Sequence, residues 1–201
     1  MDTRPKLLVA TNNKGKIREY QSLLQGIPFE IVTPADVGIS VDIDEAGVSF
    51  EENAGLKAVA AAKQSGLLSL ADDSGIEVDA LGGGPGVHSH RFAGEGASDA
   101  DRINVLLSKL KDVPQKERTA RFRCVIAIAK PGNKTGLFSG ICRGVIIDTP
   151  RGNNGFGYDP IFFIPELHKT MAELTLEEKN RISHRARAAE KAKAFLMKKP
   201  V

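Results

Sequence analysis

The stretch that decides the fold lies near the start of the chain, at residues 6–24, and reads KLLVATNNKGKIREYQSLL. Leu7–Ala10 is a short apolar run of the kind that forms a buried strand. Apolar side chains then recur at helical spacing over Lys14–Leu24, which is typical of an amphipathic helix. The segment therefore predicts a strand, a polar turn and a helix as the opening unit of the fold.

Beyond this unit, helical and strand-like segments follow one another without strict alternation. Ser49–Gln64 is rich in helix-forming residues, and Ser49 and Glu52 have capping-box spacing. Asp72–Gly75 is expected to be a turn between two strands. The mixture predicts an α/β domain with a mixed sheet. The other expected strands are 29–32, 67–71, 76–81, 120–129, 136–147 and 161–164, and the other expected helices are 99–111 and 183–197.

The composition is that of a soluble globular protein, but its charge is unevenly distributed. Hydrophobic residues make up 41% and charged residues 26%, with a net charge of +3 over 201 residues. Residues 179–201 contain eight basic residues and one acid, a balance of +7, which leaves −4 for residues 1–178. A basic end on an acidic body fits nucleic acid, a membrane surface or an anionic small molecule. The low aromatic content, 5%, argues against a stacking platform for single-stranded nucleic acid.

The sequence also indicates the compartment. No apolar run approaches the length of a membrane span, and the N-terminus has no secretory-signal pattern. Cys124 and Cys142 lie in apolar surroundings without CxxC spacing. Buried thiols in a reducing cytoplasm are therefore expected, with a disulfide or metal pair as the alternative.

The polar turn of the opening unit is the first candidate binding site. It lies at the start of a helix, where free backbone N–H groups and the helix dipole favour phosphate. Its lysines add positive charge. By itself the segment fits a solvated, helix-capping turn equally well. The residues are Thr11, Asn12, Asn13, Lys14, Gly15 and Lys16.

The second candidate is the pair Asp72 and Asp73, which follows an apolar run. Carboxylates near a core coordinate a cation or accept backbone hydrogen bonds. Such a pair suits magnesium binding and proton abstraction from water, whereas an Asx-turn is the structural alternative.

Two further segments are weaker candidates. Gly155–Pro160 has glycines that allow close approach of a flat ligand, aromatic side chains that stack on a base, and Asp159 to accept from a ring N–H. Its structural alternative is a glycine-rich turn with core aromatics. Lys179 and Ser183–Arg185 offer a helix cap and donors for a carbonyl or phosphate oxygen, or else a solvated basic helix.

In combination these segments are far more specific. Six stretches in order cover residue 9 to about 189: VATNNKGKIRE, SFEENAGLKA, LADDSGIEVDALGGGPGVHSHRFAG, ARFRCVIAIA, PRGNNGFGYDPIF and AELTLEEKNRISHRARA. Together they resemble the inosine/xanthosine triphosphate pyrophosphatases. The resemblance implies cleavage of XTP, ITP and dITP to the monophosphate and pyrophosphate, with magnesium and commonly as a homodimer. It also implies one domain over residues 1–201, an elongated mixed sheet with flanking helices, and two lobes around a central cleft.

The resemblance further implies roles for individual residues. Asp73 would be the general base and a metal ligand, with Asp72 beside it. An acid just before Gly47 would be a second metal ligand, and Asp44 and Glu45 both remain open. The residues implied to bind substrate are Thr11, Asn12, Asn13, Lys14, Gly15, Lys16, Lys57, Ser74, Phe156, Gly157, Tyr158, Asp159, Lys179, His184 and Arg185.

These residue types suit the implied chemistry. A triphosphate carries about four negative charges, which cations and magnesium would neutralise. Lys179, His184 and Arg185 would donate to the 6-oxygen of the purine, and an adenine amino group would leave those donors unpaired. The resemblance therefore implies that the basic end and the acidic body each contribute residues to one triphosphate site. It does not favour a basic tail that binds a polyanion.

One position departs from the family pattern, and two other functions remain open. His90 stands where the family usually has Ala, and we expect it to be a tolerated loop residue. One alternative is a related pyrophosphatase for pyrimidine nucleotides. The other is a nucleic-acid-binding module that uses the basic terminal helix.

Overall fold

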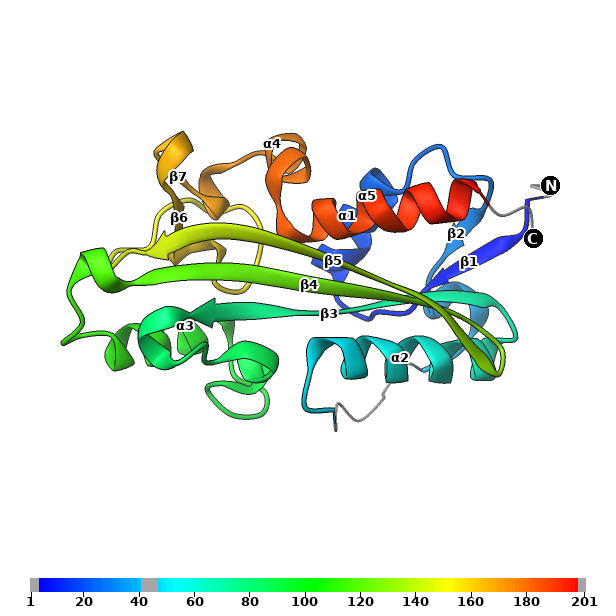
Figure 1. Cartoon of the computed structure of the whole chain (residues 1–201), viewed down its shortest axis with the longest axis horizontal. Helices are drawn as coiled ribbons and strands as arrows, with labels where there is room; N and C mark the ends of the chain where they lie inside the picture. Colours follow the sequence, from blue (N-terminus) through cyan, green and yellow to red (C-terminus); the bar gives the residue numbers. More distant parts are fainter. Residues whose placement is uncertain (1–3, 41–46, 199–201) are drawn as a thin grey trace. The chain divides into compact units, whose positions relative to one another are not determined.

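The computed structural model describes residues 4–40 and 47–198, and its strands form one seven-stranded sheet (Figure 1). The strand order is β2-β1-β3-β4-β5-β6-β7. The strands are β1 (Lys6–Val9), β2 (Glu30–Val32), β3 (Leu68–Val78), β4 (Thr119–Lys130), β5 (Asn133–Ile146), β6 (Phe162–Ile164) and β7 (Lys169–Thr170). The α-helices are α1 (Lys14–Leu23), α2 (Phe50–Ser65), α3 (Asp99–Lys109), α4 (Leu176–Ile182) and α5 (His184–Met197).

The sheet is mixed, as the sequence predicts. β1 pairs in parallel with both β2 and β3, whereas β6 pairs antiparallel with both β5 and β7. The parallel part is built by the opening strand–turn–helix unit, and the hairpin β4–β5 turns at Gly132, whose φ is +81°. The prediction of an α/β fold with a mixed sheet and flanking helices is therefore confirmed.

The chain divides into two compact units. Unit 1 comprises the described residues up to Asp73, Cys124–Gly140 and the described residues from Arg185 onward. Unit 2 comprises Ser74–Arg123 and Ile141–His184. Because each unit is assembled from separate segments, the long strands β3, β4 and β5 contribute residues to both.

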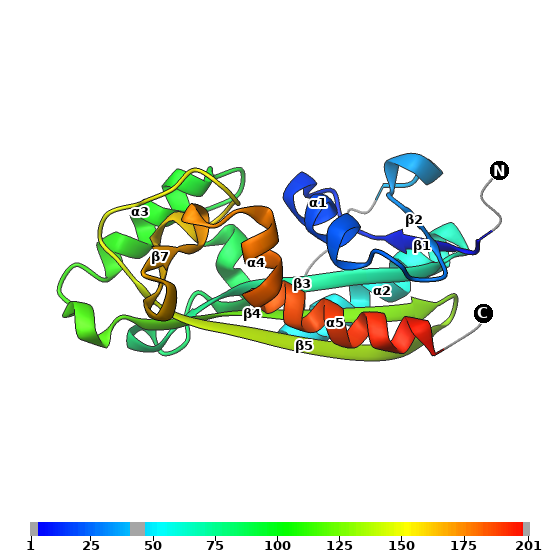
Figure 2. The same cartoon turned by 90° about the horizontal axis from the view of Figure 1, so that it is seen from above.

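Unit 1 has helices on both faces of its strands. On one face, apolar side chains of β1, β3 and β4 pack against Tyr20 of α1, against Leu24 directly after it, and against the alanines of α5. The alternate strand residues, such as Leu8 and Val125, point to the opposite face and are also buried. There α2 presents a row of small buried side chains and runs beside β3 (Figures 1 and 2). The buried alanines allow this helix to approach the sheet closely.

Unit 2 has its own hydrophobic core. Ile76 and Val78 of β3 pack with Phe122 of β4, with Leu106 on the apolar face of α3, and with Phe162 of β6. The capping box of α3 is complete, because Ser98 Oγ accepts from the Asp101 backbone N–H and the Asp101 carboxylate accepts from the Ser98 backbone N–H. This core supports the loops that carry the candidate site residues of unit 2.

The expected turn at Asp72–Gly75 is wrong, because β3 continues through it without a break. Alternation sends the two carboxylates to opposite faces of the strand, where each meets its own cationic partner. Gly75 does not turn the chain. A Cβ there would lie 2.4 Å from both Gly86 O and Ser89 Oγ, so glycine lets the 3₁₀ helix Gly86–Arg91 pack directly on the strand.

The other elements follow the sequence with small shifts at their ends. Ser49 caps α2 by accepting from the Glu52 backbone N–H. The Glu52 carboxylate accepts from Val48 N rather than from Ser49 N, so the predicted capping box is not fully formed. α4 was not predicted. Its signal was present, because Thr175 and Glu178 make a complete capping box.

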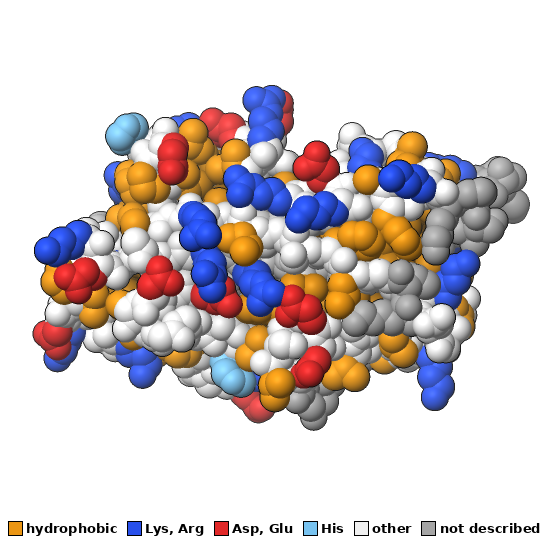
Figure 3. Space-filling model, in the orientation of Figure 1, with side chains coloured by type: hydrophobic (Ala, Val, Ile, Leu, Met, Phe, Trp, Pro, Cys, Tyr) orange, Lys and Arg blue, Asp and Glu red, His pale blue; other side chains and the backbone are white. Residues whose placement is uncertain are grey.

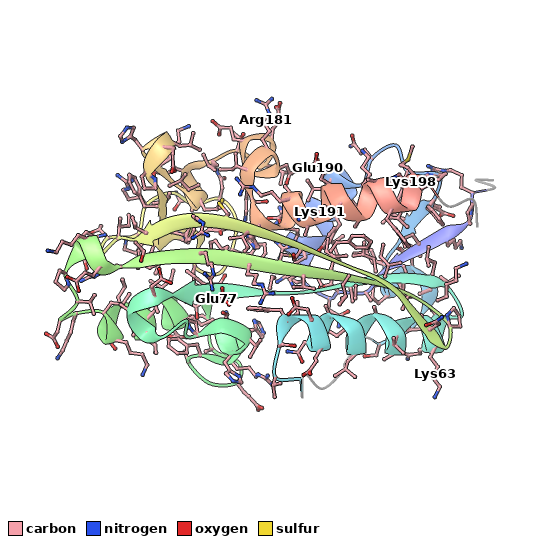
Figure 4. The ribbon with its side chains drawn as sticks, in the orientation of Figure 1. Lys63, Glu77, Arg181, Glu190, Lys191 and Lys198 are labelled. Carbon is pink, nitrogen blue, oxygen red and sulfur yellow. The ribbon has the colours of Figure 1, made fainter. Side chains whose placement is uncertain are left out.

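The basic C-terminal stretch is largely the solvent-exposed face of α5. Arg187, Lys191 and Lys198 are exposed. Figure 4 labels Lys191 on α5 and Lys198, which directly follows the helix. Acidic side chains are interspersed with Lys and Arg on the surface that Figure 3 shows. None of the helices in the described residues has both the length and the apolar composition needed to cross a membrane.

Candidate functional site

Asp73 lies in β3 within unit 1 and is held by two side chains of one helix. Lys57 Nζ donates to Asp73 Oδ1 at 2.9 Å, and Asn53 Nδ2 donates to Asp73 Oδ2 at 3.1 Å. Asn53 and Lys57 lie four residues apart in α2 and therefore share a helix face. Asp73 is only 5% exposed, so its carboxylate is fixed in orientation and compensated in charge.

Asn53 also connects this carboxylate to the chain that precedes α2. Its Oδ1 accepts from Gly47 N at 2.9 Å, while its Nδ2 faces Asp73. The side chain is 1% exposed, so both polar ends of the amide are used inside the protein. One buried amide thus fixes both the Asp73 carboxylate and the backbone at Gly47.

Asp72 points to the opposite face of β3 and belongs to a buried ionic network. Its Oδ2 lies 3.0 Å from Lys16 Nζ and 3.2 Å from Arg185 NH2. Arg185 NH1 also pairs with Glu19 at 2.6 Å. Burial by itself would raise the pKa of Asp72, but Lys16 and Arg185 outweigh it and hold the pKa far below its usual range. Asp72 is therefore a permanent anion between two cations.

The predicted phosphate-binding turn occupies the junction of β1 and α1. Thr11 Oγ1 accepts from Asn13 N at 3.2 Å, and Asn13 Oδ1 accepts from Lys16 N at 3.1 Å as the cap of α1. Lys14 is exposed and Gly15 is half-buried. Because Lys16 forms an ion pair with Asp72, the turn and the two aspartates belong to one cluster in unit 1.

In unit 2, a second cluster is centred on Asp159. Its Oδ2 accepts from Lys179 Nζ at 2.6 Å and from Phe156 N at 3.0 Å. The Lys179 ammonium also lies 4.9 Å from the centroid of the Phe156 ring, within cation–π range. Gly155 is required here, because its φ is +76° and a Cβ would lie 2.0 Å from Asp159 Oδ2. Asp159 therefore organises the loop and Lys179.

The neighbouring residues of unit 2 are equally well fixed. Tyr158 is buried and its hydroxyl donates to Ser89 O at 2.9 Å. Burial raises the pKa of Tyr158, so the hydroxyl remains a donor. His184 is buried with its ring stacked on Phe122 at a centroid distance of 4.8 Å. Ser74 follows Asp73 on β3 and is half-buried.

The structure therefore places the expected site residues in two groups. Thr11–Lys16, Lys57, Asp73 and Arg185 belong to unit 1, whereas Ser74, Phe156–Asp159, Lys179 and His184 belong to unit 2. Arg185 contacts Asp72 and Glu19 in unit 1, while Lys179 contacts Asp159 in unit 2. Asp44 and Glu45 lie outside the described residues, and the side chain of His90 is exposed.

Sequence reasoning missed Asn53 and Glu19, although spacing offered a signal for both. Asn53 precedes Lys57 by four residues, and Glu19 follows Lys16 by three. Residues at these separations lie on the same face of a helix, so each would point where its lysine points. A polar residue that shares a helix face with an expected site lysine is thus itself a candidate.

The metal-binding capacity of the described residues centres on Asp73. Within residues 4–40 and 47–198, no group of three or more His, Cys, Asp or Glu side chains is arranged to hold a metal ion. Magnesium is commonly bound through one or two carboxylates together with substrate phosphates. Asp73, a nearly buried carboxylate of β3 that faces α2, fits that mode of binding, whereas Asp72 is paired with Lys16 and Arg185.

Comparisons with known proteins show the family of the chain. The Ham1 family model matches residues 7–195. The dITP/XTP pyrophosphatase of Geobacter sulfurreducens is 55% identical over 91% of this chain and 92% of its own. That of Bacillus subtilis is 47% identical over 94% and 96%.

Solved structures show the same similarity. A HAM1 protein from Coxiella burnetii has a TM-score of 0.88 and 41% identity, covering 97% of this chain and 100% of its own. The Staphylococcus aureus Ham1 protein has a TM-score of 0.84 and 44% identity, covering 95% and 97%. The fold and the site thus define an α/β protein in which two adjacent aspartates, Asp72 and Asp73, each form an ion pair with a lysine. The chain belongs to the Ham1 family.

Proposed function

We propose that the protein hydrolyses XTP, ITP and dITP to the monophosphate and pyrophosphate, and so removes deaminated purines from the nucleotide pool. The observation that carries the proposal is the Asp73 carboxylate, fixed by Asn53 and Lys57, in a chain of the Ham1 family. The relatives named dITP/XTP pyrophosphatase support the choice of substrate.

Asp73 is the proposed general base. Attack on a phosphorus requires a positioned water and charge stabilisation more than covalent catalysis. A carboxylate held at both oxygens is well suited to orient a water and accept its proton. Lys57 and Lys16 supply positive charge in the same unit, and the N–H groups at the start of α1 add anion-binding donors.

Magnesium is the proposed cofactor. Asp73 would hold it, together with an acid from the segment before Gly47, for which Asp44 and Glu45 are the candidates. When bound, the ion neutralises charge on the phosphate oxygens. Lys16 and Lys57 bind and orient the phosphates, and Asn53 keeps the Asp73 carboxylate in its orientation.

The residues around Asp159 are the proposed base-reading groups. Phe156 offers a ring for stacking, and Lys179 and His184 offer donors toward a 6-oxygen. Because the Lys179 side chain is 4% exposed and pairs with Asp159, its ammonium is held in one position. Arg185 is proposed to bind substrate as well, from its place beside Asp72 in unit 1.

Three further properties belong to the proposal. The whole chain, residues 1–201, acts as one domain, since neither unit is a continuous segment that folds from one stretch of sequence. The thiols of Cys124 and Cys142 are both buried, which suits a reducing cytoplasm. The active form is a homodimer without nucleic acid, which sedimentation of the purified protein with and without duplex DNA would test.

Substitution of Asp73 tests the catalytic role. Asp73→Asn keeps the size of the side chain but removes the proton acceptor. We expect pyrophosphate release from dITP to fall by at least about 100-fold, because general-base catalysis contributes about 10²–10⁴-fold. The measurement is pyrophosphate release under saturating dITP, with circular dichroism to show that the fold persists.

The control is Glu51→Gln on the same helix as Lys57, outside the Asp73 contacts described above. It should keep near-normal turnover. If Asp73→Asn also retained near-normal turnover while folded, Asp73 would not be the general base.

A further inference from the structure

Besides the contact of Lys179 with Asp159, three hydrogen bonds hold the loop Gly155–Asp159 of unit 2. Phe156 N donates to Asp159 Oδ2 at 3.0 Å, which is a contact within the loop. The Tyr158 hydroxyl donates to Ser89 O at 2.9 Å. The third contact comes from α3, where Asp99 Oδ2 accepts from Gly157 N at 2.7 Å. Asp99 is 58 residues distant in sequence from Gly157, and no motif points to it.

Asp99 is itself fixed by a buried arginine. Arg102 NH1 donates to Asp99 Oδ1 at 2.6 Å, while Arg102 Nε donates to His90 O at 2.7 Å. Arg102 is only 7% exposed. The two oxygens of Asp99 are therefore divided between Arg102 and the loop. Through this pair, the first turn of α3 connects the loop to the 3₁₀ helix that ends at Arg91.

Asp99 is free for this contact because it has no part in the capping of α3. Ser98 and Asp101 form the capping box, with Asp101 Oδ2 accepting from Ser98 N at 2.9 Å. Asp99 and Asp101 thus lie in the same helical turn and carry the same charge. Asp99 binds the loop, whereas Asp101 caps the helix.

The loop requires such an anchor because of its glycines. Gly155 and Gly157 have φ values of +76° and +63°, and glycine is free to leave these conformations in the absence of contacts. A charge-assisted hydrogen bond to a backbone N–H is short and strong. It fixes the peptide between Phe156 and Gly157, and so the backbone from which the Phe156 ring projects.

We propose that Asp99 is a positioning residue that orders the base-binding loop before substrate binds. The entropic cost of ordering the loop then does not reduce the affinity for substrate. The proposal rests on the proposed function, in which the ring of Phe156 stacks on the base. A pre-ordered loop improves affinity without taking part in the attack on phosphorus. Loss of Asp99 should therefore raise KM and leave kcat nearly unchanged.

The test compares Asp99→Ala with Asp101→Ala in the full-length protein. For Asp99→Ala we expect a KM for dITP about tenfold higher, the size expected for one lost charge-assisted hydrogen bond, with kcat within about twofold. The amide exchange of Gly157, followed by NMR without nucleotide, should accelerate about tenfold or more. Asp101→Ala should lower the urea midpoint through loss of the cap but leave the KM and the Gly157 exchange rate unchanged.

Asp99→Asn is a second, more conservative variant that tests the proposal if the alanine variant fails to fold. Its amide oxygen still accepts from Gly157 N but no longer pairs with the Arg102 charge, so its KM should lie between those of wild type and Asp99→Ala. Equal KM values for Asp99→Ala and Asp101→Ala, or unchanged Gly157 exchange in Asp99→Ala, would overturn the proposal. If the wild type failed to hydrolyse dITP, the proposed function would fail, whereas the exchange rate of Gly157 would still report on the anchor.

Discussion

At the scale of single residues, the adjacent pair Asp72 and Asp73 has two separate environments. Asp73 meets the neutral amide of Asn53 and one lysine, whereas Asp72 meets a lysine and a fully buried arginine. The strand alternation that separates them also separates their roles. Asp73 is proposed to act on water, and Asp72 is an internal anion that fixes Lys16 and Arg185.

Asn53 should matter for turnover rather than only for stability. Asn53→Ala removes the donor to Asp73 and the acceptor for Gly47 N. We expect kcat for dITP to fall about 10- to 100-fold, as is typical when the partner that orients a ligating carboxylate is removed. Steady-state kinetics measure this effect.

The matched control for Asn53 is Ser49→Ala, which removes the cap of the same helix. It should cost about 1 kcal/mol of stability and leave kcat unchanged. An equal loss of kcat in both variants would show that Asn53 acts only through the stability of α2.

The buried network around Asp72 predicts a pH-dependent stability. The pKa of Asp72 is lower in the folded protein than its ordinary value of 3.8, so the unfolded chain takes up the proton first as the pH falls. The stabilisation is complete above that ordinary pKa and is lost as the pH drops below it toward the pKa of the folded state.

Asp72→Asn isolates this contribution. At pH 7 we expect the variant to be less stable by about 3–5 kcal/mol, because it leaves Lys16 and Arg185 without their shared anion. The difference from wild type in urea unfolding should narrow as the pH falls from about 4 to about 2. A difference that stayed constant over this range would show that Asp72 does not carry the pH dependence.

At the scale of elements, β3 is where sequence reasoning and structure diverge. Asp-Asp-Ser-Gly has the composition of a turn, yet the stretch is the middle of an 11-residue strand. The partners that make this possible, Lys16, Asn53, Lys57 and Arg185, come from three different helices. Local propensity cannot reveal tertiary partners of this kind. The opening unit was predictable because its signals are local.

Gly75 should be the position of β3 that is least tolerant of an added methyl group. In Gly75→Ala, the Cβ would lie 2.4 Å from the backbone oxygen of Gly86, which cannot move aside as a side-chain end can. We expect a loss of about 1–3 kcal/mol or more, the usual effect of overpacking, in urea unfolding. Ser74→Ala, at the neighbouring strand position, should cost much less, and equal losses would contradict a packing role for Gly75.

At the scale of the whole molecule, the charge asymmetry acquires a structural meaning. Of the basic C-terminal stretch, Lys179 and Arg185 are buried in ion pairs, while Arg187, Lys191 and Lys198 face solvent. The motifs around Lys179 and Arg185 predicted that these two residues belong to a site. Their pairing with Asp159 and Glu19 could not be predicted, because Asp159 is 20 residues from Lys179 and Glu19 is 166 residues from Arg185.

The family and the candidate site residues could both be predicted from the sequence, because six motifs occur in it in the family's order. What required coordinates was the second layer of residues, namely Asn53 behind Asp73 and Asp99 behind Gly157. These residues act through a backbone or a carboxylate rather than on a ligand. Helix spacing marks Asn53 as a candidate, but its contact with Asp73, like that of Asp99 with Gly157, depends on distances that only the fold sets.

The measurement that tests the central claim most directly is a side-by-side rate panel with pyrophosphate as the measured product. The substrates are XTP, ITP, dITP, GTP, dATP, dUTP and dTTP, each with magnesium. We predict that kcat/KM for XTP, ITP and dITP exceeds that for dATP by at least about 100-fold, because donors aimed at a 6-oxygen would remain unpaired with adenine. It should also exceed that for dUTP and dTTP, whose smaller pyrimidine rings lack the purine 6-oxygen. Equal rates across the panel, a preference for dUTP or dTTP, or release of single phosphate in place of pyrophosphate would contradict the account.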